Sequence, residues 1–361
     1  MRSIKVRVAV GVAAAAAVAL LGACSANAPA PGNGAAGADG SFKVGLLLPE
    51  TAVARYEGRD RPYFEAALKQ QCPGCQFLYS NANSSAATQQ QQAQSMLTQG
   101  ANVLVVDPVD GKAAASIVSA AASRKVPVVA YDRLIDSPDL AYVVSNDYEQ
   151  VGRLQAQSLV DKLKADGVAL SAGGVLMMNG ASTDFNAGLI KRGAMSVLEQ
   201  SGYPILSSID TWDPDVAQNW VAGQITRFGK RIVGFYSAND GNAGAAIAAA
   251  RAGGLTPLPP STGLDASVAG LQSILVGDQY MTTYNAFQKE ANTAVTVALQ
   301  LARGEKPNAT TQLEGRPASI NAPVAVTRSN IASTVLADGF YTAADICVAQ
   351  YQQACAAAGI R

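Results

Sequence analysis

Short apolar runs alternate with longer amphipathic runs from residue 42 to residue 252, and this alternation constrains the fold more than any other feature. The apolar runs have the length of strands, and the amphipathic runs carry apolar residues at helical spacing. Strands that alternate with helices of this length form a parallel sheet covered on both faces, so we predict an α/β fold. The expected strands are 42–48, 76–79, 103–106, 126–131, 141–144, 174–178, 205–209 and 232–236, and the expected helices are 60–70, 84–99, 112–124, 150–164, 186–200, 215–228 and 242–252.

The run from Val126 to Arg133 reads Val-Pro-Val-Val-Ala-Tyr-Asp-Arg and ends with an acid beside a base, Asp132 and Arg133. Ligands of open α/β sheets bind outside the carboxyl ends of the strands. A carboxylate next to a guanidinium at that place forms charge-assisted hydrogen bonds with small polar groups. A surface turn whose two charges merely face water fits the same residues.

Polar residues recur directly after the expected strands in both halves of the chain. Loops contain such residues in any case, because they cap helices and form turns. Their recurrence in two units nevertheless predicts a cleft between two rims, with many hydrogen-bond donors and acceptors and no nucleophile–base pair. The residues concerned are Asn81, Asn83, Asp107, Asp132, Arg133, Asp184, Asn186, Trp212, Asp213, Asn239, Asp240 and Asp265.

Composition excludes several classes of function. The 27 basic and 27 acidic residues balance and form no basic stripe, which argues against a nucleic-acid partner. The 361 residues, enough for two domains, include no histidine, so a Ser-His-Asp triad, a Cys-His pair and a histidine-ligated metal are excluded. No glycine-rich dinucleotide motif or P-loop follows the strands. We therefore expect neither a cofactor nor a metal.

The N-terminus has the pattern of a targeting segment. Three basic residues precede an apolar, alanine-rich run over residues 8–21, which is short for a membrane-spanning helix. The run ends in Leu21-Gly22-Ala23-Cys24, which resembles the lipobox of bacterial lipoproteins. We predict a signal peptide over 1–23, a lipid on Cys24 and a flexible linker over 24–41 that holds the protein outside the membrane. An ordinary signal peptide with an incidental cysteine is the alternative.

The other four cysteines are Cys72 and Cys75, which flank Pro-Gly, and Cys347 and Cys355 near the C-terminus. The first pair resembles a redox motif, but it follows a helical pattern and precedes a strand, whereas a catalytic cysteine of that kind starts a helix. We predict two structural disulfides, Cys72–Cys75 and Cys347–Cys355. A four-cysteine zinc site would require the C-terminus to reach the first loop.

Four segments carry a resemblance to a known family when they are taken together and in order. They are 126–133, then 151–156 with 159–161, then 237–240 with 243–244, and finally 277–282. With them the chain resembles the sugar-binding proteins of ABC importers, and in particular the xylose-binding members, from about residue 42 to residue 340.

The resemblance implies the type 1 periplasmic binding protein fold, in which two Rossmann-like lobes with parallel sheets are joined by three crossovers. The crossovers are expected near Ser145, Thr283 and Pro323. The N-terminal lobe then comprises 42–145 plus 284–323, and the C-terminal lobe comprises 146–283 plus 324–361.

The family's ligand lies in the cleft between the lobes, and the contacts carry over position by position. Carboxylates accept hydrogen bonds from hydroxyl groups, and arginine and asparagine donate them. Aromatic rings supply apolar walls, here a tyrosine where the xylose-binding members have tryptophan. The implied contacts are Arg55, Tyr56, Asp132 and Arg133 in the first lobe and Asp184, Asn186, Trp212, Asn239 and Asp265 in the second.

Two departures from the family pattern bear on the identity of the sugar. Asn285 stands where the family commonly has a lysine that contacts the ligand in the xylose-binding members. Leu264 stands where the family has glutamine, between Gly263 and Asp265. We expect Asn285 to face the ligand and both changes to alter the preference among sugars.

The resemblance implies an extracytoplasmic, lipid-anchored and monomeric solute-binding component of an importer, which takes up xylose or a related pyranose and delivers it to an ABC permease. It implies no enzymatic activity, although a glycosidase that uses Asp132 and Asp184 as a carboxylate pair is an alternative. A sugar-responsive repressor is disfavoured, because a signal peptide stands where a DNA-binding segment would be. A binding protein for a different monosaccharide or a sugar-like signal, acting as a sensor or chemotaxis partner, is a further alternative.

Overall fold

The computed structural model describes residues 41–53 and 55–360. The predicted signal peptide and Cys24 lie outside the described residues. Within the described part of the chain, no helix is both long and apolar enough to cross a membrane.

A seven-stranded sheet has the strand order β10-β11-β5-β4-β3-β1-β2. β10 and β11 form an antiparallel hairpin, and every other neighbouring pair is parallel. The second crossover thus returns the chain to this sheet, where β11 lies beside β5. The strands are β1 (Lys43–Leu48), β2 (Gln76–Asn81), β3 (Val103–Val106), β4 (Val128–Tyr131), β5 (Tyr142–Asn146), β10 (Thr311–Leu313) and β11 (Arg316–Asn321).

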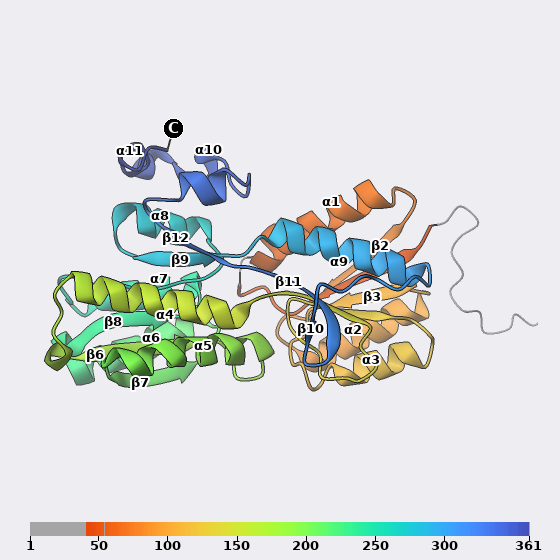
Figure 1. Cartoon of the computed structure of the whole chain (residues 1–361), viewed down its shortest axis with the longest axis horizontal. Coiled ribbons are helices and arrows are strands. Elements are labelled where there is room, and N and C mark those ends of the chain that lie inside the picture. The colour runs from red at the N-terminus through yellow and green to blue at the C-terminus, as the bar shows by residue number, and fades with distance from the viewer. Residues whose placement is uncertain (1–40, 54, 361) are drawn as a thin grey trace, which may run out of the picture. The chain divides into compact units, whose positions relative to one another are not determined.

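Helices cover both faces of this sheet, and we call the whole the N-terminal lobe. Alternate residues of β1 point to opposite faces, as the pleat requires. Leu46 packs in the cluster under α1 and α9, and Leu47 packs in the cluster under α2 and α3. α9 lies along α1 although the two are far apart in sequence (Figure 1). The helices are α1 (Arg61–Gln71), α2 (Ala86–Thr98), α3 (Ala115–Ala122) and α9 (Phe287–Ala302).

A three-stranded parallel sheet, β7-β6-β8, forms the centre of the C-terminal lobe. Single bridges at Phe235–Ser261 and Leu264–Thr283 continue it toward the antiparallel pair β9-β12. α4 and α5 contribute to one apolar cluster on this sheet, and α6 and α7 to another. The strands are β6 (Gly174–Asn179), β7 (Ile205–Asp210), β8 (Ile232–Ser237), β9 (Met281–Tyr284) and β12 (Val324–Thr327), and the helices are α4 (Tyr148–Ala165), α5 (Phe185–Ser201), α6 (Pro214–Phe228), α7 (Asp240–Ala252) and α8 (Val268–Val276).

Gly152 lets α4 and α5 approach closely. A Cβ atom built on it would lie 1.9 Å from the carbonyl oxygen of Ile190, so a larger residue would push the helices apart. The close packing of α4 against α5 therefore explains why a glycine stands at position 152.

The C-terminal segment packs on α8 and on the aromatic residues around the second crossover. Phe340 packs in tilted and edge-on contacts with Tyr284, Phe287 and Tyr341, with ring centroids between 4.6 and 5.9 Å apart. The segment contains α10 (Ala343–Ile346) and α11 (Gln352–Ala357), with a π-helical turn at Ala332–Leu336 and a 3₁₀ turn at Ala349–Tyr351.

The structure confirms the α/β fold with mainly parallel sheets and shifts several predicted bounds. β4 begins at Val128 rather than Val126, because Pro127 has no N–H group for the ladder. The first helix is preceded by a π-helical turn, η1 (Tyr56–Asp60), which carries residues toward the cleft. The exact bounds of the two lobes stay a prediction.

Both predicted disulfides are present. Cys72 is joined to Cys75 and Cys347 to Cys355, with Cα atoms 5.3 and 5.9 Å apart. The first follows the end of α1, where the Cys72 N–H donates to the Leu68 carbonyl at 2.8 Å. The pairing uses all four thiols and leaves none of them for a zinc ion.

We expect a Cys347→Ala/Cys355→Ala variant to lose roughly 2–3 kcal/mol of unfolding free energy, because the bridge closes a loop of eight residues in the unfolded chain. Urea unfolding with and without the substitutions measures this difference. The wild-type protein unfolded under reducing conditions is the matching control. An unchanged urea midpoint in the variant would contradict the prediction.

Candidate ligand-binding site

A small cavity of about 30 Å³ lies where the carboxyl ends of the strands of the two lobes meet. Nine of the ten predicted ligand contacts line it, and they come from both lobes. They are Arg55, Tyr56, Asp132, Arg133, Asp184, Asn186, Trp212, Asn239 and Asp265, and they are joined by Val53, Tyr148, Ile190 and Leu264.

Arg55 occupies the first corner of the site, immediately before the π-helical turn. Its guanidinium forms a two-pronged ion pair with Asp60, with N–O distances of 2.8 and 3.0 Å. Its Nη1 atom also lies 3.3 Å from the Asp132 carboxylate and 3.3 Å from the Tyr148 hydroxyl. The guanidinium carbon stands 3.9 Å from the centre of the Phe287 ring. These partners hold Arg55 in one orientation.

Arg133 follows β4 and occupies the second corner. Its Nη2 atom donates to the Tyr56 hydroxyl at 2.8 Å and lies 2.9 Å from a carboxylate oxygen of Glu50. Its Nη1 atom donates to the Pro108 carbonyl at 3.3 Å, and its Nε atom lies 3.6 Å from Asp107. Each corner of the site is thus a buried guanidinium surrounded by oxygen atoms.

Several contacts cross from one lobe to the other at the cavity, including those of the Tyr148 hydroxyl of α4 with Arg55 and Asp132. Arg133 Nε lies 3.0 Å from Asp184 Oδ2, and Asn186 Nδ2 donates to the Asp132 carbonyl oxygen at 3.0 Å. Asp184 also accepts from the Asn186 N–H at 2.8 Å and so begins α5. The side chains that could bind a ligand bind one another in this conformation, which explains the small volume of the cavity.

Trp212 forms an apolar wall in the loop between β7 and α6. Its indole N–H donates to Asp184 Oδ2 at 2.9 Å, which fixes the orientation of the ring. Gly180 makes room for it, because a Cβ atom there would lie 2.0 Å from a ring carbon. Gly180, which directly follows β6, therefore contributes to the site by leaving space for the Trp212 ring.

Two carboxylates of the site sit on left-handed backbone. Asp132 has φ +62° and Asp265 has φ +93°, a region that residues other than glycine adopt only with strain. Such strain persists where the surroundings impose it, and it is typical of functional sites. The Asn239 side chain accepts from the Asn242 N–H at 2.9 Å as the cap of α7. Asn239 also lines the cavity, so one residue serves both as a helix cap and as part of the site.

The charges of the site depend on one another. Burial raises the pKa of the Asp60 carboxyl and raises the pKa of Asp107 and Glu290 well above their usual range, and Arg55 opposes the shift at all three. Burial alone would lower the pKa of Arg55 and Arg133, but the carboxylates around each guanidinium raise it further above its usual value. Both guanidinium groups therefore stay charged.

Asn285, the tenth predicted contact, is fully buried after β9 and does not line the cavity in this conformation. Neither its side-chain nitrogen nor its side-chain oxygen has a hydrogen-bond partner among the described residues. Its contact with a ligand stays a prediction.

Five further residues support the site and were not among the ten predicted ligand contacts, although Asp107 was among the residues that predicted the cleft. Glu50 and Asp107 follow the ends of β1 and β3 and contact the Arg133 guanidinium. Tyr148, the first residue of α4, contacts the Arg55 guanidinium. The other two, Asp60 and Glu290, lie on helices and face Arg55 from there. The position after a strand indicated Asp107 and could have indicated Glu50, whereas the helical residues carry no such signal.

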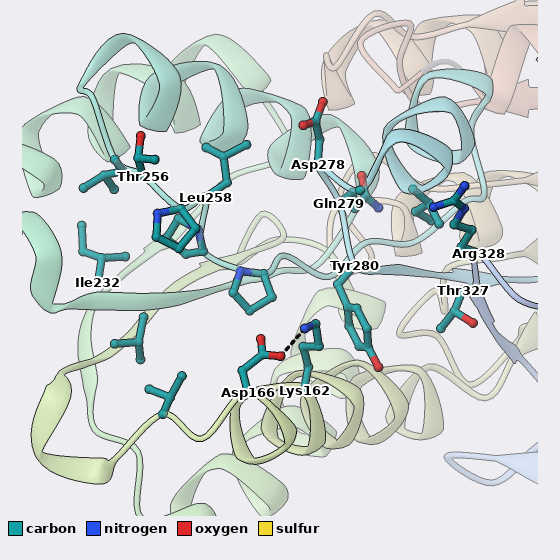
Figure 2. Close-up of a pocket in the computed structure, with 18 of the residues that line it drawn as sticks. Lys162, Asp166, Ile232, Thr256, Leu258, Asp278, Gln279, Tyr280, Thr327 and Arg328 are labelled. Carbon is teal, nitrogen blue, oxygen red and sulfur yellow. Dashed lines mark hydrogen bonds and ion pairs between the residues drawn. The ribbon is translucent and has the colours of Figure 1, made fainter. Parts of the chain in front are cut away.

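A larger cavity, of about 1060 Å³, lies in the C-terminal lobe and contains none of the predicted contacts. Its walls include Ile232, the first residue of β8, so it lies at the amino-terminal end of that strand. Figure 2 shows the Lys162–Asp166 ion pair and Tyr280 on its walls. Because α/β sheets bind ligands at the carboxyl ends of strands, we assign the ligand site to the smaller cavity.

The fold and the two-lobed site are those of a ligand-binding protein. Residues 44–306 match the family model described as a periplasmic binding protein domain, and the chain belongs to this family. The family consists of non-enzymatic binding proteins, in agreement with the prediction from the sequence.

Individual relatives agree with this membership. The chain is 32% identical to the D-xylose-binding periplasmic protein of Escherichia coli, over 84% of this chain and 92% of that protein. It is 30% identical to a multiple sugar-binding periplasmic protein of Azospirillum brasilense, over 83% and 90%. A carbohydrate transporter solute-binding protein of Chloroflexus aurantiacus, solved in complex with D-glucose, superposes with a TM-score of 0.77 at 28% identity, over 84% of this chain and 98% of that one.

Proposed function

We propose that this protein is the extracytoplasmic solute-binding component of an ABC sugar importer and that it binds xylose or a related pyranose between its lobes. The observation that carries the proposal is the pair of buried corners, Arg55 with Asp132 and Arg133 with Asp184, beside the fixed ring of Trp212. Vicinal hydroxyl groups both donate and accept hydrogen bonds, and a carboxylate next to a guanidinium provides an acceptor and a donor for them.

In this proposal the sugar replaces contacts that the site makes with itself. A cavity of about 30 Å³ holds about one water molecule, so the lobes must part before a pyranose enters. Hydroxyl groups then take the place of the Arg133–Asp184 and Asn186–Asp132 contacts, and the lobes close on the sugar. A ligand shifts such an equilibrium only by its stronger binding to the closed form, which both sets of residues provide here.

The sugar relatives support a pyranose but differ among themselves. One is named for D-xylose, one for multiple sugars, and one was solved with D-glucose. Leu264 lines the cavity, whereas Asn285 does not. Both residues depart from the family pattern, which supports the second candidate, a binding protein or sensor for another monosaccharide.

A thermal-shift panel followed by calorimetric titration tests the proposal. The panel contains D-xylose, D-glucose, D-galactose, L-arabinose and D-ribose. The preferred sugar at a hundred times its Kd is expected to stabilise the protein by about 2.7 kcal/mol, because it binds only the folded state. Xylose as the best ligand supports the first candidate, and another sugar as the best ligand supports the second. No response to any sugar would refute both.

We also propose that Cys24 carries a lipid and that a permease receives the sugar from the anchored protein. The sequence Leu21-Gly22-Ala23-Cys24 supports the anchor. Intact-mass measurement of membrane-extracted protein is expected to give a chain that begins at Cys24 with an acyl adduct. A chain that is cleaved elsewhere and carries no adduct would refute the anchor and leave sugar binding untouched.

Sugar affinity is expected to rise with pH through the titration of Asp265. Burial, opposed by Arg55 and assisted by the charges of Asp240, Asp132 and Asp60, raises the pKa of this carboxyl to about 7. If hydroxyl groups donate to the ionised carboxylate, only that form binds well, and it grows from about a tenth to about nine tenths between pH 6 and pH 8. The Kd is therefore expected to fall about tenfold over this range. Calorimetry on wild type and Asp265→Asn tests this, and an equal pH dependence in both would contradict it.

A further inference from the structure

A second hollow, of about 530 Å³, opens beside the small cavity. We call it the aromatic hollow and define it by Gly58, Arg59, Trp212, Gly244, Phe340 and Tyr341, which all line it. Its residues come from the N-terminal lobe, from the C-terminal lobe and from the C-terminal segment. It is therefore lined by several parts of the fold and is not a groove on one element.

The aromatic hollow adjoins the ligand site. Arg55, Trp212, Asn239 and Asp265 line both spaces. These shared side chains form the boundary between the two spaces, so a molecule that reaches from one space into the other would pass between them. The two spaces differ greatly in size, since the ligand site measures about 30 Å³ and the hollow about 530 Å³.

The chemistry of the hollow suits a sugar ring. Trp212, Phe340 and Tyr341 line the hollow; Phe340 and Tyr341 are only 3% and 7% exposed and lie under the Arg59 guanidinium, so the half-buried Trp212 ring provides most of the apolar surface for the C–H face of a pyranose. The Arg59 guanidinium lies 4.1 Å from the centre of the Tyr341 ring and 5.0 Å from that of Phe340, so a donor for hydroxyl groups is fixed against the same surface. Asp265 and Asn239 add an acceptor and an amide at the boundary with the first site.

Two glycines keep the hollow open. A Cβ atom built on Gly58 or on Gly244 would meet nothing within 4 Å. Gly244 stands inside α7, where glycine costs about 1 kcal/mol relative to alanine, and no close contact requires it there. The open space is thus kept at a position where helix stability alone favours a larger residue.

From this arrangement we propose that the protein binds disaccharides, with one ring in the ligand site and the second ring in the aromatic hollow. The proposal rests on the proposed function, because the first ring uses the same contacts as a monosaccharide. It extends the substrate class from single pyranoses to short glycosides.

The test compares monosaccharides with disaccharides on matched variants. D-xylose is paired with xylobiose and D-glucose with cellobiose, and each is titrated by calorimetry. Gly244→Phe places a ring in the aromatic hollow, and Gly58→Leu fills it from the opposite lobe. Gly223→Phe, on the exposed face of α6, and Gly188→Phe, beside a separate hollow next to α5, are controls, because a Cβ atom on either also meets nothing within 4 Å.

We expect a disaccharide to bind wild type with a Kd within about tenfold of its monosaccharide. Gly244→Phe and Gly58→Leu are expected to weaken it by more than about tenfold and to change the monosaccharide Kd by less than about twofold, which also shows that the variants are folded. The two controls are expected to change neither.

Three results would overturn the inference. Monosaccharide binding without disaccharide binding would refute the hollow as a sugar subsite and leave the proposed function intact. Equal disaccharide affinity in wild type and both filled variants, or a loss in Gly188→Phe instead, would place the second ring elsewhere. Binding of neither class by wild type would refute the proposed function itself.

Discussion

Replacing Arg55 by methionine is expected to lower the free energy of unfolding by about 3–5 kcal/mol, the loss typical of breaking a buried ion pair from one side. Arg55 is buried, and its guanidinium neutralises Asp60 at 2.8 Å and Asp132 at 3.3 Å, with Glu290 3.9 Å away. Methionine keeps much of the side-chain volume over Phe287 but leaves these carboxyl groups without their cation. Urea unfolding by circular dichroism measures the loss.

Arg61→Met is the matched control for this substitution. Arg61 pairs with Glu57 on the surface, where the two side chains are 44% and 37% exposed, and exposed pairs contribute about 0–1 kcal/mol. We therefore expect the control to unfold almost as wild type does. Equal losses in the two variants would mean that Arg55 is not held as a buried charge.

Replacing Asp184 by alanine is expected to weaken sugar binding by at least a hundredfold. The carboxylate joins three parts of the site, since it faces Arg133 at 3.0 Å, orients the Trp212 indole at 2.9 Å and caps α5 through Asn186 at 2.8 Å. A charge-assisted hydrogen bond contributes about 1.5–3 kcal/mol, and the variant loses the carboxylate that we expect to make two of them with the sugar. Calorimetric titration with the preferred sugar measures the change.

Asp213→Ala separates the loss of a ligand contact from the loss of a helix cap. Asp213 caps α6 by accepting from Asp215 at 2.9 Å and Val216 at 3.3 Å, and it does not line the cavity. Each cap is expected to contribute about 1 kcal/mol to stability. Asp184→Ala should lose more unfolding free energy than Asp213→Ala, because it also leaves the buried Arg133 without one of its partners. If sugar affinity falls equally in both, Asp184 acts only as a cap.

The sequence predicted the parts of the fold that repeat locally. The length of an apolar run predicted the buried strand that occupies 128–131, and helical spacing of apolar residues predicted the helix that occupies 148–165. The positions directly after strands predicted Asp132, Arg133 and Asp184 as site residues. Residues beyond 303 carry short elements without a clear period. The hairpin β10–β11 and the helices α10 and α11 are ordered by tertiary contacts and a disulfide, which no local pattern records.

The supporting residues of the site were hidden for a related reason. Glu290 lies on α9 and reaches Arg55 only because the second crossover returns the chain to the first lobe. Gly180 matters only because Trp212, more than thirty residues later in the chain, lies over it. Such relations depend on how distant elements are packed, and spacing along the chain does not encode them.

The contact between Arg133 and Asp184 has a kinetic consequence. A sugar arriving from solution must wait for these two groups to separate, so association is limited by opening of the cleft and is slower than free diffusion. The wait is the same for every sugar, and differences in affinity between sugars therefore arise mainly from how fast each one leaves. When the sugar leaves, Arg133 and Asp184 pair with each other again, so neither charge lacks a partner in the closed protein after release to a permease.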